Sequence, residues 1–130
     1  MRFLITCSLA LAVSLVAQDE AALEKNMKAI DGHAKVIRGL TARTGAEAAD
    51  NAEKIAALYT EMRDFWVKRD VADAVKSADE GKEAAVQLAS AAKANDAEKG
   101  EAAFKALNGT CRGCHTAHRE RLPDGKYKIK

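Results

Sequence analysis

Apolar residues recur every three or four positions along most of this chain, which is the pattern of amphipathic helices that bury one face. The pattern predicts a first helix over about 20–41, a second from 44–47 to about 67, a third from about 70, and a last one that opens at 95–98. The predicted inward positions are Leu23, Met27, Ile30, Ala34 and Ile37; Ala48, Ala52, Ile55, Tyr59, Met62 and Trp66; Val71, Val75, Ala78, Ala85, Ala89 and Ala92; and Gly100, Phe104, Leu107, Cys111, Cys114 and His118.

The helix ends carry their own signals. Asp19 can cap the first helix, and the strings Thr44–Glu47 and Asn95–Glu98 have the spacing of capping boxes. Pro123 ends the last helix because proline cannot donate to the helix ladder, and the polar tail 124–130 is expected to be loose. Short connections favour antiparallel neighbours, so the chain is predicted to be all-α, an antiparallel up-and-down four-helix bundle.

Residues 1–17 have the pattern of a cleaved signal peptide. Arg2 gives a positive start, an apolar run covers 3–16, and Ala17 is a small residue at the cleavage point. The alternative, a membrane anchor, is disfavoured because a span needs roughly 20 apolar residues. Cleavage leaves a mature domain over 18–130 with no stable membrane insertion, and we expect it to be a periplasmic protein exported by a bacterium.

Length and charge narrow the class of protein. The 130-residue chain is 48% hydrophobic and has 21 Lys and Arg against 19 Asp and Glu. This is one domain with room for a core, and no nucleic-acid partner is expected because neither sign of charge dominates. Only 5% of the residues are aromatic. The alanine-lined third helix therefore leaves space that a buried cofactor would fill.

The string Cys111-Arg112-Gly113-Cys114-His115 places two thiols and one imidazole at the spacing used for haem c. On a helix these three side chains share one face. Both thiols can then add across the vinyl groups of the haem while the imidazole reaches the iron. Export agrees with this chemistry, since haem c is attached outside the cytoplasm. We expect one covalent haem c, bound by Cys111 and Cys114, with His115 as the proximal iron ligand.

Three other uses of this string remain open. A thioredoxin-like redox pair would need a βαβ setting, which the helical pattern lacks. A zinc site could combine Cys111, Cys114 and His118, although no second ligand pair follows. A disulfide suits an oxidising compartment, but two cysteines three apart on a continuous helix have poor geometry for one. The remaining cysteine, Cys7, leaves with the signal peptide.

The haem string falls on the last predicted helix and not near the start of the mature chain. In this the chain resembles the class II c-type cytochromes, the cytochrome c-prime and cytochrome c-556 family. The resemblance is carried by 102–119, by Met27–His33 on the first helix, and by the alanine-rich segment and short turn at 84–96. It implies a four-helix bundle around one haem c, and a homodimer paired through the first two helices.

The resemblance also implies that one residue of the first helix faces the distal side of the iron, and Met27 falls at that place. A methionine ligand there implies a His/Met-ligated, low-spin single-electron carrier that serves redox partner proteins and is not an enzyme. The alternative is a five-coordinate cytochrome c-prime that binds small gases, nitric oxide and carbon monoxide. In that case Met27 fills the core, as methionine often does.

Three further residues bear on the site. Arg119 matches a basic residue that the family keeps beside the haem, and a plain surface arginine is an equal alternative. His118 stands where relatives have an aromatic residue, and we expect it to pack or to line the pocket. His33 is rotated roughly 120° from Met27 on the helix, so we expect it to be partly exposed and not to bind iron.

Overall fold

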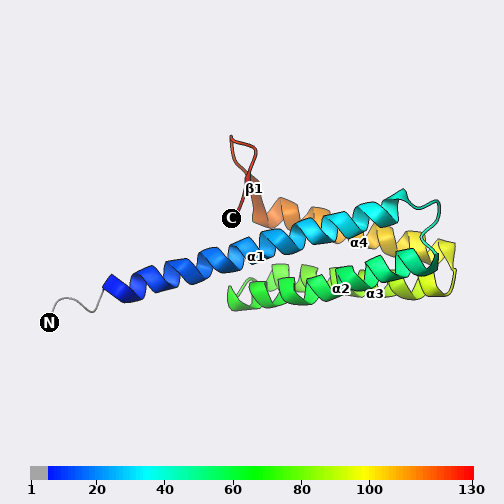
Figure 1. The fold of residues 1–130 in the computed structure, drawn as a ribbon, viewed down its shortest axis with the longest axis horizontal. Coiled ribbons are helices and arrows are strands. Elements are labelled where there is room, and N and C mark those ends of the chain that lie inside the picture. Colours follow the sequence, from blue (N-terminus) through cyan, green and yellow to red (C-terminus); the bar gives the residue numbers. More distant parts are fainter. Residues whose placement is uncertain (1–5) are drawn as a thin grey trace.

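The computed structural model describes the backbone of residues 6–130, and the side chains of residue 16 and of 18–130. Four helices and a two-stranded sheet make up this part of the chain (Figure 1). They are α1 (Thr6–Gly39), α2 (Gly45–Lys68), α3 (Ala72–Lys93), α4 (Ala97–His118), β1 (Arg119–Arg121) and β2 (Tyr127–Ile129). Successive helices run antiparallel. The predicted up-and-down four-helix bundle is therefore confirmed, with a small sheet added at its end.

Local signals set the ends of the middle helices. Asp70 and Asn95 have φ values of 56° and 52°, in the left-handed conformation that stops a helix. Asp96 caps α4, because its side chain accepts a hydrogen bond from the Lys99 amide at 3.0 Å; this cap lies one residue later than predicted. Thr44 is extended before α2, but its side chain makes no capping hydrogen bond, so the predicted capping box does not form there.

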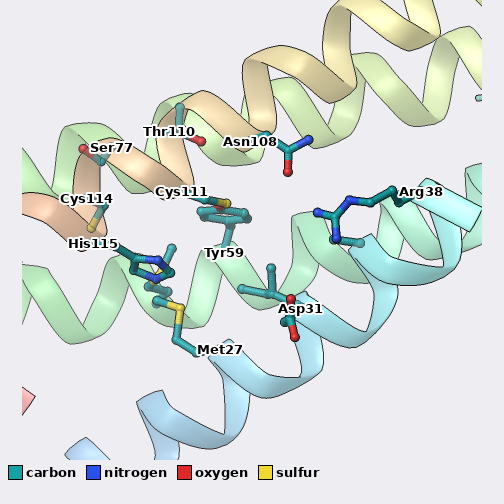
Figure 2. A pocket seen from close by; sticks show the side chains of 13 residues that line it. Met27, Asp31, Arg38, Tyr59, Ser77, Asn108, Thr110, Cys111, Cys114 and His115 are labelled. Carbon is teal, nitrogen blue, oxygen red and sulfur yellow. The ribbon is translucent and has the colours of Figure 1, made fainter. Parts of the chain in front are cut away.

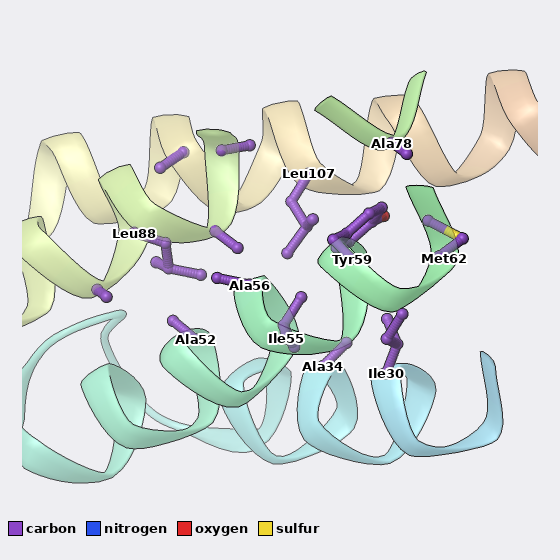
Figure 3. Packing of buried hydrophobic residues seen from close by; sticks show 14 of the residues in the cluster. Ile30, Ala34, Ala52, Ile55, Ala56, Tyr59, Met62, Ala78, Leu88 and Leu107 are labelled. Atoms are coloured by element: carbon purple, nitrogen blue, oxygen red, sulfur yellow. The ribbon is translucent and has the colours of Figure 1, made fainter. Parts of the chain in front are cut away.

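The core lies along α2, which packs against α1 and α3. Every predicted inward position of α2 is buried. The largest fully buried side chains, one from each helix, are Ile37, Ile55, Leu88 and Leu107. Figure 3 shows the small side chains of Ala52 and Ala56 among the larger ones of Ile55, Leu88 and Leu107. Small side chains let neighbouring helices approach closely and fill the space without voids.

α1 and α4 are in contact near one end of the bundle and are separated toward the other end. They are in contact where α1 ends. There the guanidinium carbons of Arg38 and Arg43 lie 6.0 and 5.0 Å from the centre of the Phe104 ring of α4. Gly100 lies there against the Arg43 carbonyl, which a side chain at this position would meet. Farther along, the described parts of α1 and α4 have no packed interface comparable to those of the other neighbouring helices. The functional site lies in that gap.

The first helix begins earlier than predicted. It starts at Thr6 and runs through Asp19 without a break, because the segment before Asp19 is rich in leucine and alanine and contains neither glycine nor proline. An ion pair of 2.9 Å joins Glu20 to Arg69 at the end of α2, and the earlier turns of α1 project beyond the bundle (Figure 1). Residues 1–5 of the predicted signal peptide lie outside the described residues, and its cleavage stays a prediction. No helix in the described part is long and apolar enough to cross a membrane.

The C-terminal segment forms a β-hairpin, so the prediction of a loose tail is wrong. α4 ends at His118, before Pro123 is reached, and β1 pairs antiparallel with β2 through a turn in which Gly125 has a φ of 83°. The Lys130 amide donates to the His118 carbonyl at 3.1 Å, and Ile129 packs against the main core. Each strand has only three residues, too few for alternation to be read from the sequence.

Gly81 offers a direct test of the packing between α2 and α3. The Cβ of an alanine at this position would fall on the ring of Tyr59, which is buried. We expect Gly81→Ala to lower the free energy of unfolding by about 1–3 kcal/mol through overpacking, measured by denaturant titration. Gly32→Ala is the control, because a Cβ there has no neighbour within 4 Å and alanine favours a helix by up to about 1 kcal/mol. Equal losses in both variants would contradict this packing.

Candidate functional site

A cavity of about 220 Å³ lies between α1 and α4, above the side chains of α2 (Figure 2). All four helices contribute to its walls, so its shape depends on the whole bundle. The lining residues are Met27, Ile30, Asp31, Ala34 and Arg38 from α1; Tyr59 and Met62 from α2; Ser77 from α3; and Asn108, Thr110, Cys111, Cys114 and His115 from α4.

The wall made by α4 holds the two cysteines and the histidine of the predicted haem string. Their spacing on one helix turns Cys111, Cys114 and His115 toward the same cavity. All three are partly buried, and both thiols are free. Among the described side chains, those of residue 16 and of 18–130, no three His, Cys, Asp or Glu are grouped to hold a metal ion. The zinc alternative that combined the two cysteines with His118 therefore has no support.

The surroundings keep the imidazole of His115 neutral. Burial lowers the pKa of His115, the Arg119 guanidinium lowers it further, and Asp31 opposes both in part. A neutral imidazole has a free lone pair and is the form that binds a metal. Burial also raises the pKa of the Cys114 thiol, and Cys111 adds to this effect. A protonated thiol carries the hydrogen needed for addition across a vinyl double bond.

Tyr59 belongs to the site, although its position in the sequence predicted only an ordinary core residue. Its hydroxyl oxygen lies 3.3 Å from the sulfur of Cys111. Burial raises the pKa of Tyr59, and the charge of Cys111 raises it further. The phenol therefore stays protonated and can donate a hydrogen bond to the sulfur. Residues that line a cavity recur with the same helical spacing as residues of the core, so the sequence did not indicate the contact between Tyr59 and Cys111.

The wall that faces α4 is mainly apolar. Met27, Ile30 and Ala34 line it from α1, and Met62 adds to it from α2. In Figure 2 the side chain of Met27 points into the cavity toward His115. Met27 is half-buried and packs against the main core. Its place fits both predicted roles, as an iron ligand and as core filling.

Arg119 lies beside the cavity and not in it. It lines a second, more open pocket, which shares His115 with the first. Its charge acts on the imidazole from that side, as the lowered pKa of His115 indicates. Arg119 thus lies next to His115 at the border of the cavity, and its predicted place at the haem edge stays a prediction.

The other two histidines are held by contacts outside the cavity. His33 is half-buried, and its Nδ1 lies 2.8 Å from the side-chain oxygen of Asn51. The Nε2 of His118 lies 2.8 Å from the carboxylate of Asp73, and its ring centre lies 5.2 Å from that of Trp66. His118, at the end of α4, therefore packs against both α2 and α3, and neither histidine lines the cavity.

The residues of the cavity fit a covalently bound haem. Cys111 and Cys114 offer the two thiols that its attachment needs, and His115 offers one nitrogen ligand for the iron. All three donors face one cavity, and most of the opposite wall is apolar, with Asp31 and Arg38 as its charged side chains. Apolar groups suit the faces of a porphyrin. This arrangement suits haem better than it suits a thioredoxin-like pair, which would need a βαβ setting.

Comparisons with known proteins agree with this geometry. A family model described as Cytochrome C' matches residues 19–119. The cytochrome c' of Pararhodospirillum photometricum is 37% identical, over a matched region that covers 80% of this chain and 100% of that protein. No solved structure gives a significant match. The chain therefore belongs to the cytochrome c' family of class II c-type cytochromes, whose members carry covalently bound haem c.

Proposed function

We propose that this protein is a five-coordinate cytochrome c' that binds nitric oxide and carbon monoxide at a single covalent haem c. The proposal depends on the contrast between the two cavity walls. The α4 wall presents the imidazole of His115, and the facing wall presents hydrocarbon and thioether groups at Met27, Ile30 and Ala34. Membership of the cytochrome c' family supports this alternative better than the predicted His/Met electron carrier. Its periplasmic location and a homodimer through α1 and α2 stay predictions.

Each side chain has a separate task in this proposal. Haem c, when bound, supplies an iron that takes up small gases reversibly. Cys111 and Cys114 hold the group by thioether bonds, and the neutral imidazole of His115 offers the proximal nitrogen. Met27 keeps water out and limits the space to small molecules. The Tyr59 hydroxyl lies 3.3 Å from the sulfur of Cys111. A thioether sulfur can only accept, so the hydroxyl would donate to it and fix one attachment point against α2.

The His/Met-ligated electron carrier is the second candidate, and one observation favours it. The Met27 side chain points toward His115 across the cavity (Figure 2). A thioether is a soft ligand that raises the haem potential when it is paired with histidine. The protein would then pass single electrons between redox partner proteins and catalyse no bond chemistry. The two candidates share the haem attachment and differ in whether the sulfur of Met27 binds the iron.

Carbon monoxide binding to the ferrous protein separates the two candidates when two Met27 variants are compared. Met27→Leu keeps the apolar volume and removes the sulfur, whereas Met27→Ala removes most of the volume. If Met27 only lines the cavity, we expect Met27→Leu to keep the wild-type affinity for carbon monoxide. We expect Met27→Ala to bind carbon monoxide on the order of tenfold more tightly, because the smaller side chain leaves more room for the ligand.

Val36→Ala is the matched control, since Val36 is an exposed apolar residue on the same helix. It should bind carbon monoxide as the wild type does. If Met27 is an iron ligand, the wild type resists the gas, and both Met27 variants bind it far more tightly. That pattern would contradict the gas-binding proposal and support the electron carrier.

A further inference from the structure

Positive charge is concentrated in the C-terminal part of the chain. Six of the 21 Lys and Arg, but only two of the 19 Asp and Glu, lie in residues 112–130. This segment has a formal side-chain charge of +4, and the rest of the chain has −2. The small total of +2 conceals this separation. The positive segment includes the end of α4 and the hairpin, which lie together in Figure 1.

The three arginines of this segment have no acidic partner among the described residues, and Lys130 donates to a backbone carbonyl. Both acidic side chains of the hairpin pair with its lysines, with oxygen–nitrogen distances of 3.1 and 4.0 Å. Arg112, Arg119 and Arg121 make no ion pair with any residue that the structure describes. Unpaired guanidinium groups keep their charge and their hydrogen-bond donors available for a partner.

These three arginines line one open pocket together with His115, Thr116 and Tyr127. The guanidinium carbon of Arg119 in β1 lies 4.0 Å from the centre of the Tyr127 ring in β2, a cation–π contact between the two strands of the hairpin. Each lining side chain can donate a hydrogen bond, and none is a carboxylate. The pocket is therefore complementary to carboxylate groups. Arginine and tyrosine are also the residues that contribute most to binding in protein interfaces.

His115 connects this pocket with the cavity, because it lines both. The basic face, defined as Arg112, Arg119, Arg121 and Tyr127, therefore borders the place proposed for the haem. The hairpin that completes this face begins where the match to the family model ends, at residue 119. A family resemblance thus could not assign a role to it.

We propose that the basic face docks an acidic redox protein that exchanges one electron with the haem. In the oxidising direction the ferrous iron loses one electron, and the one-electron centre of the partner gains it; in the other direction the transfer is reversed. Opposite charges would steer the two proteins together with the haem edge toward the partner. The inference depends on the proposed function only in requiring that haem is present.

Charge reversal at Arg121 tests the basic face, since Arg121 does not line the haem cavity. Poly-L-aspartate serves as the acidic probe, and its binding to the purified haem protein is measured by calorimetry at low salt. We expect Arg121→Glu to weaken this binding about tenfold and Arg121→Gln to weaken it less. Lys105→Glu is the matched control, because Lys105 is an exposed residue in the first half of α4 and its reversal changes the net charge equally. It should weaken binding roughly twofold at most.

Two small oxidants of opposite charge give a second readout. The ferrous protein passes one electron to ferricyanide, an anion, or to tris(phenanthroline)cobalt(III), a cation. In Arg121→Glu the reaction with ferricyanide should slow by roughly three- to tenfold at low salt, and the reaction with the cobalt complex should become faster. High salt should remove both differences, and Lys105→Glu should change both rates only slightly.

Two results would overturn the proposal. Equal losses of poly-L-aspartate binding in Arg121→Glu and Lys105→Glu would show that only net charge matters. Unchanged binding in both Arg121 variants would show that the basic face is not used. Binding of the probe does not require haem, so its failure is distinguishable from a failure of the proposed function, which would appear as an absent response to carbon monoxide.

Discussion

Replacing Cys111 and Cys114 together by serine is expected to abolish covalent haem in the purified protein. These are the two thiols that face the cavity, and a serine hydroxyl does not form the thioether that haem c requires. Haem staining on a denaturing gel should become negative, and the intact mass should equal that of the bare polypeptide. Acid extraction should release into the organic phase any haem that the variant still holds by His115 alone.

Cys7→Ser is the control for this experiment. Cys7 is the remaining cysteine of the chain and lies in the predicted signal peptide. The control should keep the full content of covalent haem. Haem that stays on the polypeptide of the double variant through denaturation would mean that the attachment has been assigned to the wrong residues.

His115→Gly is expected to have the second largest effect, the loss of the proximal iron ligand. The structure places this partly buried imidazole, whose pKa is lowered by burial, in the cavity beside both thiols. The Soret band of the haem-bearing fraction should shift away from its wild-type position. Added imidazole should restore that position, because the free ligand can occupy the space that the side chain leaves. Recovery would distinguish a lost ligand from a misfolded protein.

His118→Gly is the matched control, one helix turn farther along α4. His118 bonds to Asp73 and packs on Trp66 outside the cavity. Its loss should leave the haem spectrum unchanged and should lower the free energy of unfolding by about 1–3 kcal/mol. If both glycine variants shifted the spectrum equally, or if imidazole rescued neither, His115 would not be the proximal ligand.

The helices were predictable because helical periodicity is a local property of the sequence. The stripe through Ile55 and Tyr59 placed the buried face of α2 correctly. On both α2 and α3 the predicted stripe was too narrow, because each of these helices packs against two others. Ala56 and Phe65 on α2, and Ala84 and Leu88 on α3, are therefore buried as well. The width of the buried face of a helix depends on how many helices pack against it, and the pattern of the sequence does not give that number.

The chemistry of the site was predictable only for residues that lie close together in the sequence. Cys111, Cys114 and His115 form one continuous string, and their spacing alone brings them to one face. The hydrogen bond from Tyr59 to Cys111 joins helices far apart in the sequence, so tertiary packing was needed to find it. The hairpin was missed for a related reason, since its short strands are held by contacts with the end of α4.

The state of Met27 could not be predicted from its position. From this half-buried position on α1, Met27 could equally well line the cavity or bind the iron. The two states differ by one sulfur–iron bond, whose formation depends on a small adjustment of the side chain. Periodicity places the residue on the correct face, but it carries no information on that adjustment.

The most direct test of the open distal site is the absorption spectrum of the ferrous wild-type protein before and after carbon monoxide is added. An open site predicts a high-spin, five-coordinate spectrum that the gas converts completely into a low-spin one. A spectrum that is already low-spin without the gas, and that carbon monoxide leaves unchanged, would contradict this function and would indicate that the sulfur of Met27 binds the iron.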